Sequence, residues 1–285
     1  MRLPSFKCNS CDGVHNSLDI HFTSHCDNKC PFCIDSTNRC TQKCVPDVQG
    51  ILKTLKEQQS KFDDVLFLGG EPCLYLQELL DCVKQIKAQT TLKVYVTTSV
   101  PYVCYAKKEI FFEIINLIDG LNISAQHYNE ALGDEIRKSH SMYDRQKFYA
   151  SLPHKDKIRI TVNLVKPYFD NKQEIINCLR HYDSMRFGSI LLRELQHSPE
   201  YYVSFEKVMG IKLPSAYAHG CQTTIEIPGE NFSTPIILKR SCSLVEGSVK
   251  ASWDDVLKSF IKIFKTPPNN NFGVVWENGS MTEGW

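Results

Sequence analysis

Residues 18 to 36 read LDIHFTSHCDNKCPFCIDS, an apolar run followed at once by three cysteines. The run LDIHF, residues 18–22, has the length and character of a buried strand. Cys26, Cys30 and Cys33 follow at the spacing C-x3-C-x2-C, on the loop that should leave this strand. In α/β barrels, reactive groups gather on the loops after the carboxyl ends of strands. The stretch therefore places three thiols at the functional edge of an α/β sheet.

The alternation of strand and helix patterns continues to about residue 195. Apolar runs of strand length are separated by segments whose apolar residues recur every three or four positions, as on one face of a helix. Such alternation implies right-handed crossovers and a parallel sheet. Six units are too few to close an eight-stranded barrel, so the sequence predicts an α/β fold, a partial (β/α)6 TIM-like barrel. The predicted strands are 18–22, 64–72, 92–99, 120–126, 158–165 and 188–195, and the predicted helices are 45–60, 75–88, 108–118, 143–151 and 171–182.

The pattern changes from about residue 198. Two apolar, strand-like runs flank a Pro-Gly turn within 220–243, a helical pattern covers 252–264, and the tail 272–285 is expected to add an edge strand. We therefore expect three parts. They are an N-terminal extension with a C-x2-C pair (1–17), the partial barrel (18–197) and a small C-terminal α+β cap (198–285).

Charge and composition exclude some classes of protein. The 285 residues include 33 Lys and Arg against 32 Asp and Glu, so no broad positive field is present to collect nucleic acid without specificity. The start lacks the apolar core of a secretory signal, and no apolar stretch is long enough to span a bilayer. We expect a cytoplasmic protein without a membrane partner, whose 13 cysteines are metal ligands and buried thiols.

The spacing of the cysteine triplet suits an iron-sulfur cluster, but a [4Fe-4S] cluster takes four ligands, so one iron would be left open. The motif resembles the signature of the radical S-adenosylmethionine (radical SAM) superfamily, C-x3-C-x-aromatic-C, with Phe32 at the aromatic position. The resemblance implies that Cys26, Cys30 and Cys33 hold a [4Fe-4S] cluster. It also implies that the amino and carboxylate groups of S-adenosylmethionine chelate the fourth iron.

The sequence GGEP, Gly69 to Pro72, ends the second predicted strand and looks like a further element of this family. The resemblance implies that Gly69, Gly70, Glu71 and Pro72 receive the methionyl amine, through backbone carbonyls and Glu71. Glycine suits this place because a backbone without side chains approaches a ligand closely. The alternative is a structural zinc site completed by His21 or His25, with GGEP as a common turn, but it explains neither the six βα units nor the glycine pair.

The resemblance implies further cofactor-binding residues at the ends of later strands. Thr98, within Thr97 to Ser99, would line the nucleoside pocket, and Ser124 would meet the ribose or carboxylate. Arg137 looks like the arginine that pairs with the methionyl carboxylate through its guanidinium fork, and a solvated helix arginine is the alternative. Weaker candidates for the pocket, with structural burial as the alternative, are Asn163, Arg193 and Glu194.

The substrate is less well defined by the sequence. His127 and Tyr128 follow the fourth predicted strand and are candidates to contact a base or donate a hydrogen atom, although a structural histidine is equally compatible. Family members that mature peptides usually carry a leader-binding domain and a cysteine-rich extension, and we expect neither in this protein. We therefore expect a nucleoside or nucleic-acid base as substrate, with a peptide or amino-acid-derived metabolite as the alternative. The resemblance also implies that the enzyme cleaves S-adenosylmethionine reductively, with electrons from a donor such as flavodoxin or ferredoxin. A protein that binds the cluster as a scaffold, without catalysis, is the alternative to an enzyme.

The remaining cysteines leave room for a second metal site, zinc or an auxiliary iron-sulfur cluster. One possible set is Cys8, Cys11, Cys221 and Cys242, and the pair Cys40 and Cys44 is another. Packed or free thiols are the alternative, because unligated cysteine is often buried as a small hydrophobic residue.

Overall fold

The computed structural model describes residues 17–35, 44–195, 198–213, 222–241, 273–277 and 279–282. The strands are β1 (Ser17–Thr23), β2 (Asp64–Gly69), β3 (Lys93–Thr98), β4 (Gly120–Ser124), β5 (Ile158–Leu164), β6 (Ser189–Glu194), β7 (Gln222–Ile225), β8 (Ile236–Lys239), β9 (Gly273–Val275) and β10 (Met281–Thr282). The α-helices are α1 (Val48–Gln58), α2 (Leu76–Gln89), α3 (Tyr102–Ala106), α4 (Lys108–Leu117), α5 (Glu130–Arg137), α6 (Arg145–Ala150), α7 (Lys172–Ser184) and α8 (Phe205–Met209). Short 3-10 helices are η1 (Gln59–Lys61), η2 (Pro72–Tyr75), η3 (Lys155–Lys157) and η4 (Pro199–Tyr201).

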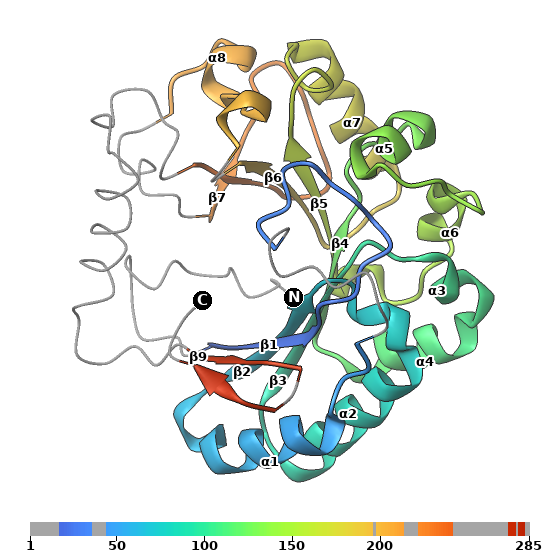
Figure 1. Ribbon diagram of the computed structural model, residues 1–285. Helices are drawn as coiled ribbons and strands as arrows, with labels where there is room; N and C mark the ends of the chain where they lie inside the picture. Colours follow the sequence, from blue (N-terminus) through green and yellow to red (C-terminus); the bar gives the residue numbers. More distant parts are fainter. Residues whose placement is uncertain are drawn as a thin grey trace.

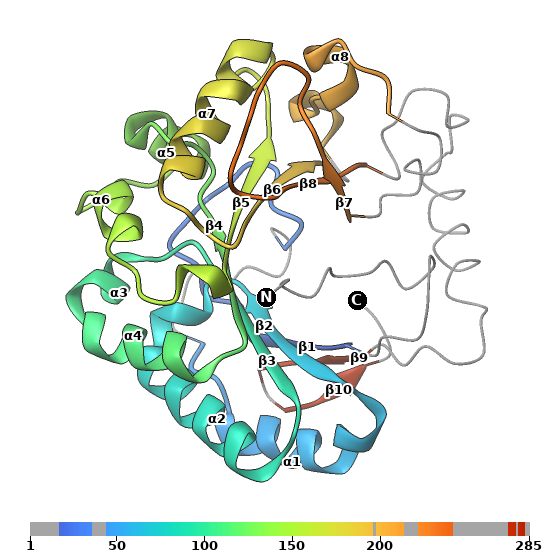
Figure 2. The same cartoon turned by 180° about the vertical axis from the view of Figure 1, so that it is seen from behind.

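The described strands form one curved sheet in the order β10-β9-β1-β2-β3-β4-β5-β6-β8-β7, with the helices on its outer side (Figures 1 and 2). Strands β1 to β6 are parallel and adjacent in chain order, as helical crossovers require. The two ends of the described sheet do not pair with each other, so the fold is a partial TIM-like barrel. The six predicted strands and their parallel arrangement are confirmed, whereas the short helices α3, α5 and α8 were not predicted.

The described parts of the C-terminal segment lengthen both ends of the barrel sheet. Strand β8 pairs in parallel with β6, and β7 pairs with β8 as an antiparallel partner. At the other end, β9 pairs in parallel with β1, and β10 pairs with β9. The predicted hairpin strands and edge strand are therefore present, joined to the barrel sheet, and the helix predicted over 252–264 lies outside the described residues.

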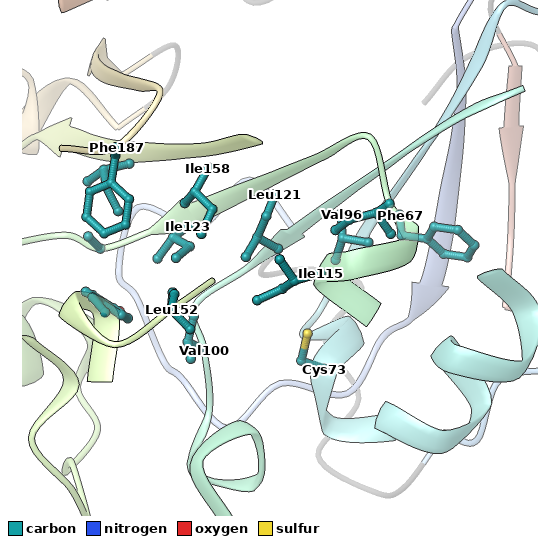
Figure 3. Packing of buried hydrophobic residues seen from close by; sticks show 14 of the residues in the cluster. Phe67, Cys73, Val96, Val100, Ile115, Leu121, Ile123, Leu152, Ile158 and Phe187 are labelled. Atoms are coloured by element: carbon teal, nitrogen blue, oxygen red, sulfur yellow. The ribbon is translucent and has the colours of Figure 1, made fainter. Parts of the chain in front are cut away.

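The core lies between the outer face of the sheet and the helices. Alternate residues of β1 and β2 face this side, where the fully buried rings of Phe22 and Phe67 meet edge to face at 5.4 Å. Figure 3 shows the same layer further along the sheet, where Ile115 of α4 lies close to Val96 and Leu121. Burial of each such side chain stabilises the fold by roughly 1.5–3 kcal/mol, which anchors the strands whose ends form the site.

The inner face of β3, β4 and β5 carries polar side chains that bond across the strands. Thr161 donates its hydroxyl hydrogen to Asn122 Oδ1 at 2.5 Å, and Asn122 Nδ2 donates to the Thr97 hydroxyl at 3.4 Å. Period-two alternation therefore gives an apolar outer face and a polar interior. The interior is suited to a polar ligand.

Candidate active site

A pocket of about 290 Å³ lies at the carboxyl ends of the parallel strands. Its volume is close to the lower end of the range for small-molecule sites, roughly 300–1,000 Å³. It brings together the three motif cysteines and residues from five strands, as expected for an α/β barrel. The lining residues are Cys26, Asn28, Cys30, Phe32, Cys33, Ile34, Leu68, Gly69, Gly70, Glu71, Thr97, Thr98, Ser99, Ser124, Gln126, Arg137, Asn163, Arg193 and Leu195.

Asn28, which the sequence analysis missed, fixes the middle of the cysteine loop. Its side chain is buried, its Nδ2 donates to the Ser99 hydroxyl at 2.8 Å, and its Oδ1 accepts from the Ser139 hydroxyl at 2.9 Å. The backbone N–H of Lys29 donates to the carbonyl of Arg137 at 2.8 Å. The loop is therefore bonded both to the end of β3 and to the end of α5.

The glycine pair is required by the contact between the end of β2 and the start of the cysteine loop. Gly70 N–H donates to the Thr23 carbonyl at 2.6 Å, and Glu71 N–H donates to the His25 carbonyl at 2.8 Å. A Cβ atom on Gly70 would lie 2.3 Å from the His25 carbonyl oxygen. Gly69 has φ +114°, a conformation that L side chains rarely adopt. The pair thus lets the backbone of β2 lie directly against the cysteine loop.

The carboxylate of Glu71 is buried and accepts four hydrogen bonds. Oε1 accepts from Cys73 N–H at 3.0 Å and from the Thr98 hydroxyl at 2.6 Å. Oε2 accepts from Ser99 N–H at 2.7 Å and from the Ser99 hydroxyl at 2.6 Å. Burial raises the pKa of Glu71, and the bonds from Ser99 and Thr98 oppose that rise.

The prediction that the Glu71 side chain receives the methionyl amine stays a prediction. An ionised carboxylate has about four acceptor positions, and all four are used within the described chain. Glu71 thereby ties the end of β2 to the end of β3, and the backbone of the GGEP segment remains open to a ligand. Pro72 begins η2, is buried, and is not among the residues that line the pocket.

Arg137 lines the pocket from the last turn of α5 and is 1% exposed, so the alternative of a solvated helix arginine is wrong. Nη1 donates to the Ala125 carbonyl at 2.9 Å, and Nη2 donates to Asp134 at 3.1 Å. Its Nε–H is buried and has no hydrogen-bond partner within the described chain. Gly133 leaves space for the guanidinium, because a Cβ there would lie 3.0 Å from Nη2. Arg137 therefore lines the pocket and keeps one buried donor that the described chain does not use.

The structure places His127 and Tyr128 outside the residues that line the pocket, so their predicted catalytic role gains no support from it. His127 is 1% exposed, its ring stacks on Tyr128, and its Nε2 lies 3.3 Å from the Glu174 carboxylate of α7. Burial lowers the pKa of His127, and Glu174 opposes that shift. The chain turns at Gln126, whose φ of +66° sends Gln126 to the pocket and the following two rings toward α7. The structural alternative therefore describes His127.

The walls from β4, β5 and β6 contribute Ser124, Gln126, Asn163 and Arg193. Asn163 Nδ2 donates to Gln126 Oε1 at 3.2 Å, and Asn163 is the register partner of Arg193. Glu194 faces the other side of β6, where its carboxylate accepts from Phe205 N–H at 2.9 Å and Ser241 N–H at 2.8 Å. Of the two predicted alternatives on β6, only Arg193 reaches the pocket.

A model of the radical SAM superfamily matches residues 20–181, more than half of the chain. The chain belongs to the radical SAM superfamily. Within the described residues, no helix has both the length and the apolarity that crossing a bilayer needs.

Solved structures of radical SAM enzymes share the fold. Streptococcus suis SuiB bound to S-adenosylmethionine is 17% identical with a TM-score of 0.59, and SuiB bound to precursor peptide SuiA is 14% identical with a TM-score of 0.53. Each comparison covers 95% of this chain and 60% of the SuiB chain. No curated protein sequence matches the chain.

The side chains of this radical SAM protein fit the cluster that the family binds. Three thiols of one loop line one pocket, and burial, with a smaller contribution from Glu71, raises the pKa of Cys26 above its usual range. In the described ranges, no three His, Cys, Asp or Glu side chains lie close enough together to hold a single metal ion. In a cubane, by contrast, each thiolate binds a separate iron.

The two histidines considered as zinc ligands both have other partners. His21 Nε2 lies 2.9 Å from Asp35, and His25 Nδ1 lies 3.2 Å from the Tyr75 hydroxyl. The predicted second metal set, Cys8, Cys11, Cys221 and Cys242, lies outside the described residues, as does Cys40 of the other pair.

Proposed function

We propose that this radical SAM protein is an enzyme that cleaves S-adenosylmethionine reductively and abstracts a hydrogen atom from a substrate. One observation carries the proposal: the three motif thiols share a pocket with Arg137, whose buried Nε–H has no partner in the described chain. When bound, the cluster and S-adenosylmethionine supply a 5'-deoxyadenosyl radical. An external reductant such as flavodoxin or ferredoxin supplies the electron, and the reaction belongs in the cytoplasm.

The residues of the chain hold and orient these groups. Cys26, Cys30 and Cys33 are the cluster ligands, and Phe32 is the aromatic wall between them. Arg137 is suited to the methionyl carboxylate, because a charged donor left unsatisfied in a buried wall favours an anionic acceptor. The backbone at Gly69 and Gly70 lines the pocket and lets a ligand approach closely, and Ser124 at the end of β4 offers a hydroxyl. Thr98 acts indirectly, since its hydroxyl hydrogen is given to Glu71.

For the substrate we propose a nucleoside or nucleic-acid base. The amides of Asn163 and Gln126 offer donors and acceptors of the kind that a base edge uses, and they lie in the pocket wall. The rings of His127 and Tyr128 no longer support this choice, because they face α7. A base within a duplex would have to be flipped out to enter such a pocket.

Peptide modification is the second candidate. It is favoured by the shared fold with SuiB, which was solved bound to precursor peptide SuiA. A cluster-binding scaffold without turnover is the third candidate.

The test begins with anaerobic reconstitution of the full chain, followed by dithionite, S-adenosylmethionine and chromatography for 5'-deoxyadenosine. Formation of 5'-deoxyadenosine that depends on Cys30 supports an enzyme. A fully loaded protein that forms none, with nucleotide and peptide candidates present, supports the scaffold. Deuterium that moves into 5'-deoxyadenosine from a labelled nucleoside supports the first substrate class, and label from a peptide alone rejects it.

A further inference from the structure

Besides the three thiols, the described pocket lining contains three charged side chains, Glu71, Arg137 and Arg193. They differ in the partners that neutralise their charge. Glu71 accepts four hydrogen bonds, and Arg137 pairs with Asp134 at 3.1 Å. Arg193 lines the same pocket, is exposed within it, and has no hydrogen bond or ion pair to any described residue. Among the described residues, the pocket therefore carries one positive charge without a partner.

Two buried guanidinium groups of the described residues have carboxylate partners. Arg145 lies 2.8 Å from Asp134, and Arg240 is ion-paired with Glu206. For Arg193, desolvation by the surrounding walls lowers the pKa, and no carboxylate opposes that shift. An uncompensated charge in a partly desolvated wall is costly, and an anionic ligand would offset that cost.

The neighbours of Arg193 suit a polar ligand as well. The parallel register pairs Arg193 of β6 with Asn163 of β5, and Asn163 bonds to Gln126 beyond the end of β4. These groups are on different elements from the glycine pair of β2 and from Arg137 of α5. The pocket thus has a second group of polar residues, on elements other than β2 and α5, and Asn163, predicted from the sequence as a cofactor residue, belongs to this group.

We propose that Arg193, together with Asn163 and Gln126, forms an oxyanion subsite, and that the substrate carries a phosphate or carboxylate group bound there. The guanidinium fork gives two parallel, charge-assisted hydrogen bonds to either group. This inference rests on the proposed function, because it names the chemical class of the substrate from which the hydrogen atom is abstracted. A nucleotide would present its phosphate to Arg193, and a peptide or amino-acid metabolite would present a carboxylate.

The test is anion binding to the full-length, cluster-loaded protein, measured by calorimetry with inorganic phosphate, pyrophosphate and benzoate, with and without saturating S-adenosylmethionine. The variants are Arg193→Gln and Arg193→Lys, and the matched control is Arg180→Gln, which removes a surface guanidinium paired with Glu230. Because Arg193 has no partner in the described chain, Arg193→Gln should unfold thermally at the same temperature as the unmodified protein.

We expect Arg193→Gln to weaken binding of the preferred anion by about tenfold or more, Arg193→Lys to weaken it less, and Arg180→Gln to leave it unchanged. Preference for phosphate or pyrophosphate identifies a phosphorylated substrate, and preference for benzoate identifies a carboxylate. The affinity for S-adenosylmethionine should stay within about twofold in Arg193→Gln, less than the effect of one charge-assisted bond.

The subsite is overturned if Arg193→Gln binds all three anions as well as the unmodified protein does, or if no anion binds the unmodified protein. It is also overturned if Arg193→Gln weakens S-adenosylmethionine binding as strongly as loss of Arg137, because Arg193 would then serve the cofactor. If the proposed function is wrong, the binding measurements should give a different result. The unmodified protein would not bind S-adenosylmethionine, while the anion titrations without cofactor would still report on Arg193.

Discussion

The two walls of the pocket use their polar groups differently. On the side of β2 and β3, Glu71, Thr98 and Ser99 bond to one another, and Asn28 ties the cysteine loop to them. On the side of β5 and β6, Asn163 makes one bond to Gln126, and Arg193 makes none to the described chain. A wall whose donors and acceptors are satisfied holds one shape, whereas unused donors are available to a ligand. In the function proposed above, the first wall supports the cluster loop and the second receives the substrate.

The largest effect should come from removing the Glu71 carboxylate. Glu71→Ala leaves the buried donors of Cys73, Thr98 and Ser99 without their acceptor, and we expect a loss of about 3–5 kcal/mol in the free energy of unfolding. Urea denaturation measures it. The matched control is Glu57→Ala on the exposed side of α1, which should change stability by less than about 0.5 kcal/mol. Equal losses in the free energy of unfolding for the two variants would show that the hydrogen bonds to Glu71 do not stabilise this wall.

Next in size is Gly70→Ala, which tests the contact between β2 and the cysteine loop. The new Cβ would lie 2.3 Å from the His25 carbonyl oxygen, so the loop must shift, at a cost of about 1–3 kcal/mol. We expect lower iron content after reconstitution. Gly229→Ala separates crowding from backbone strain, because Gly229 has φ +83° and no atom near its Cβ position. If Gly70→Ala takes up as much iron as Gly229→Ala, the close contact has no role in holding the loop.

Arg137→Lys should act on cofactor binding. The lysine keeps the charge but loses the planar fork, so we expect the dissociation constant for S-adenosylmethionine to rise about tenfold. Calorimetry on the cluster-loaded protein measures it, with Lys138→Gln on the exposed neighbouring residue as the control. An unchanged affinity in Arg137→Lys would show that the buried Nε–H does not serve the cofactor.

The smallest effect on the chemistry should come from His127→Phe. Because the ring lies outside the pocket, we expect formation of 5'-deoxyadenosine within about twofold of the unmodified protein, below the 10²-fold that loss of an acid or base typically costs. A hundredfold or larger loss in the rate of 5'-deoxyadenosine formation would support the predicted catalytic role of His127.

The same variant should change how stability depends on pH. Burial lowers the pKa of His127 in the folded state, so below its ordinary value of about 6.5 the unfolded chain binds more protons. Stability should therefore fall as the pH drops below about 6.5, and His127→Phe should make this fall shallower. Glu174 and His181 face the same ring and remain in the variant, so the difference between the two proteins isolates His127. If the free energies of unfolding of the two proteins change in parallel between pH 5 and 7.5, His127 does not contribute to the pH dependence.

Much of this fold follows from local patterns. The apolar periodicity predicts the six strands and most helices, and the spacing of Cys26, Cys30 and Cys33 predicts a common site. The short helix α5 was not predicted, because its eight residues, EALGDEIR, carry few apolar side chains. Long-range partners could not be predicted either: the donors to Glu71 at Thr98 and Ser99 are 27 and 28 residues away. The direction of His127 depends on the left-handed conformation of Gln126, which no sequence pattern marks.

We propose that Cys26, Cys30 and Cys33 hold a [4Fe-4S] cluster whose open iron binds S-adenosylmethionine. Electron paramagnetic resonance of the dithionite-reduced, anaerobically reconstituted protein is the most direct test. We expect a cluster signal that changes when S-adenosylmethionine is added and that is absent from Cys30→Ala. A protein that takes up only zinc, or a cluster whose signal is the same with and without S-adenosylmethionine, would contradict it.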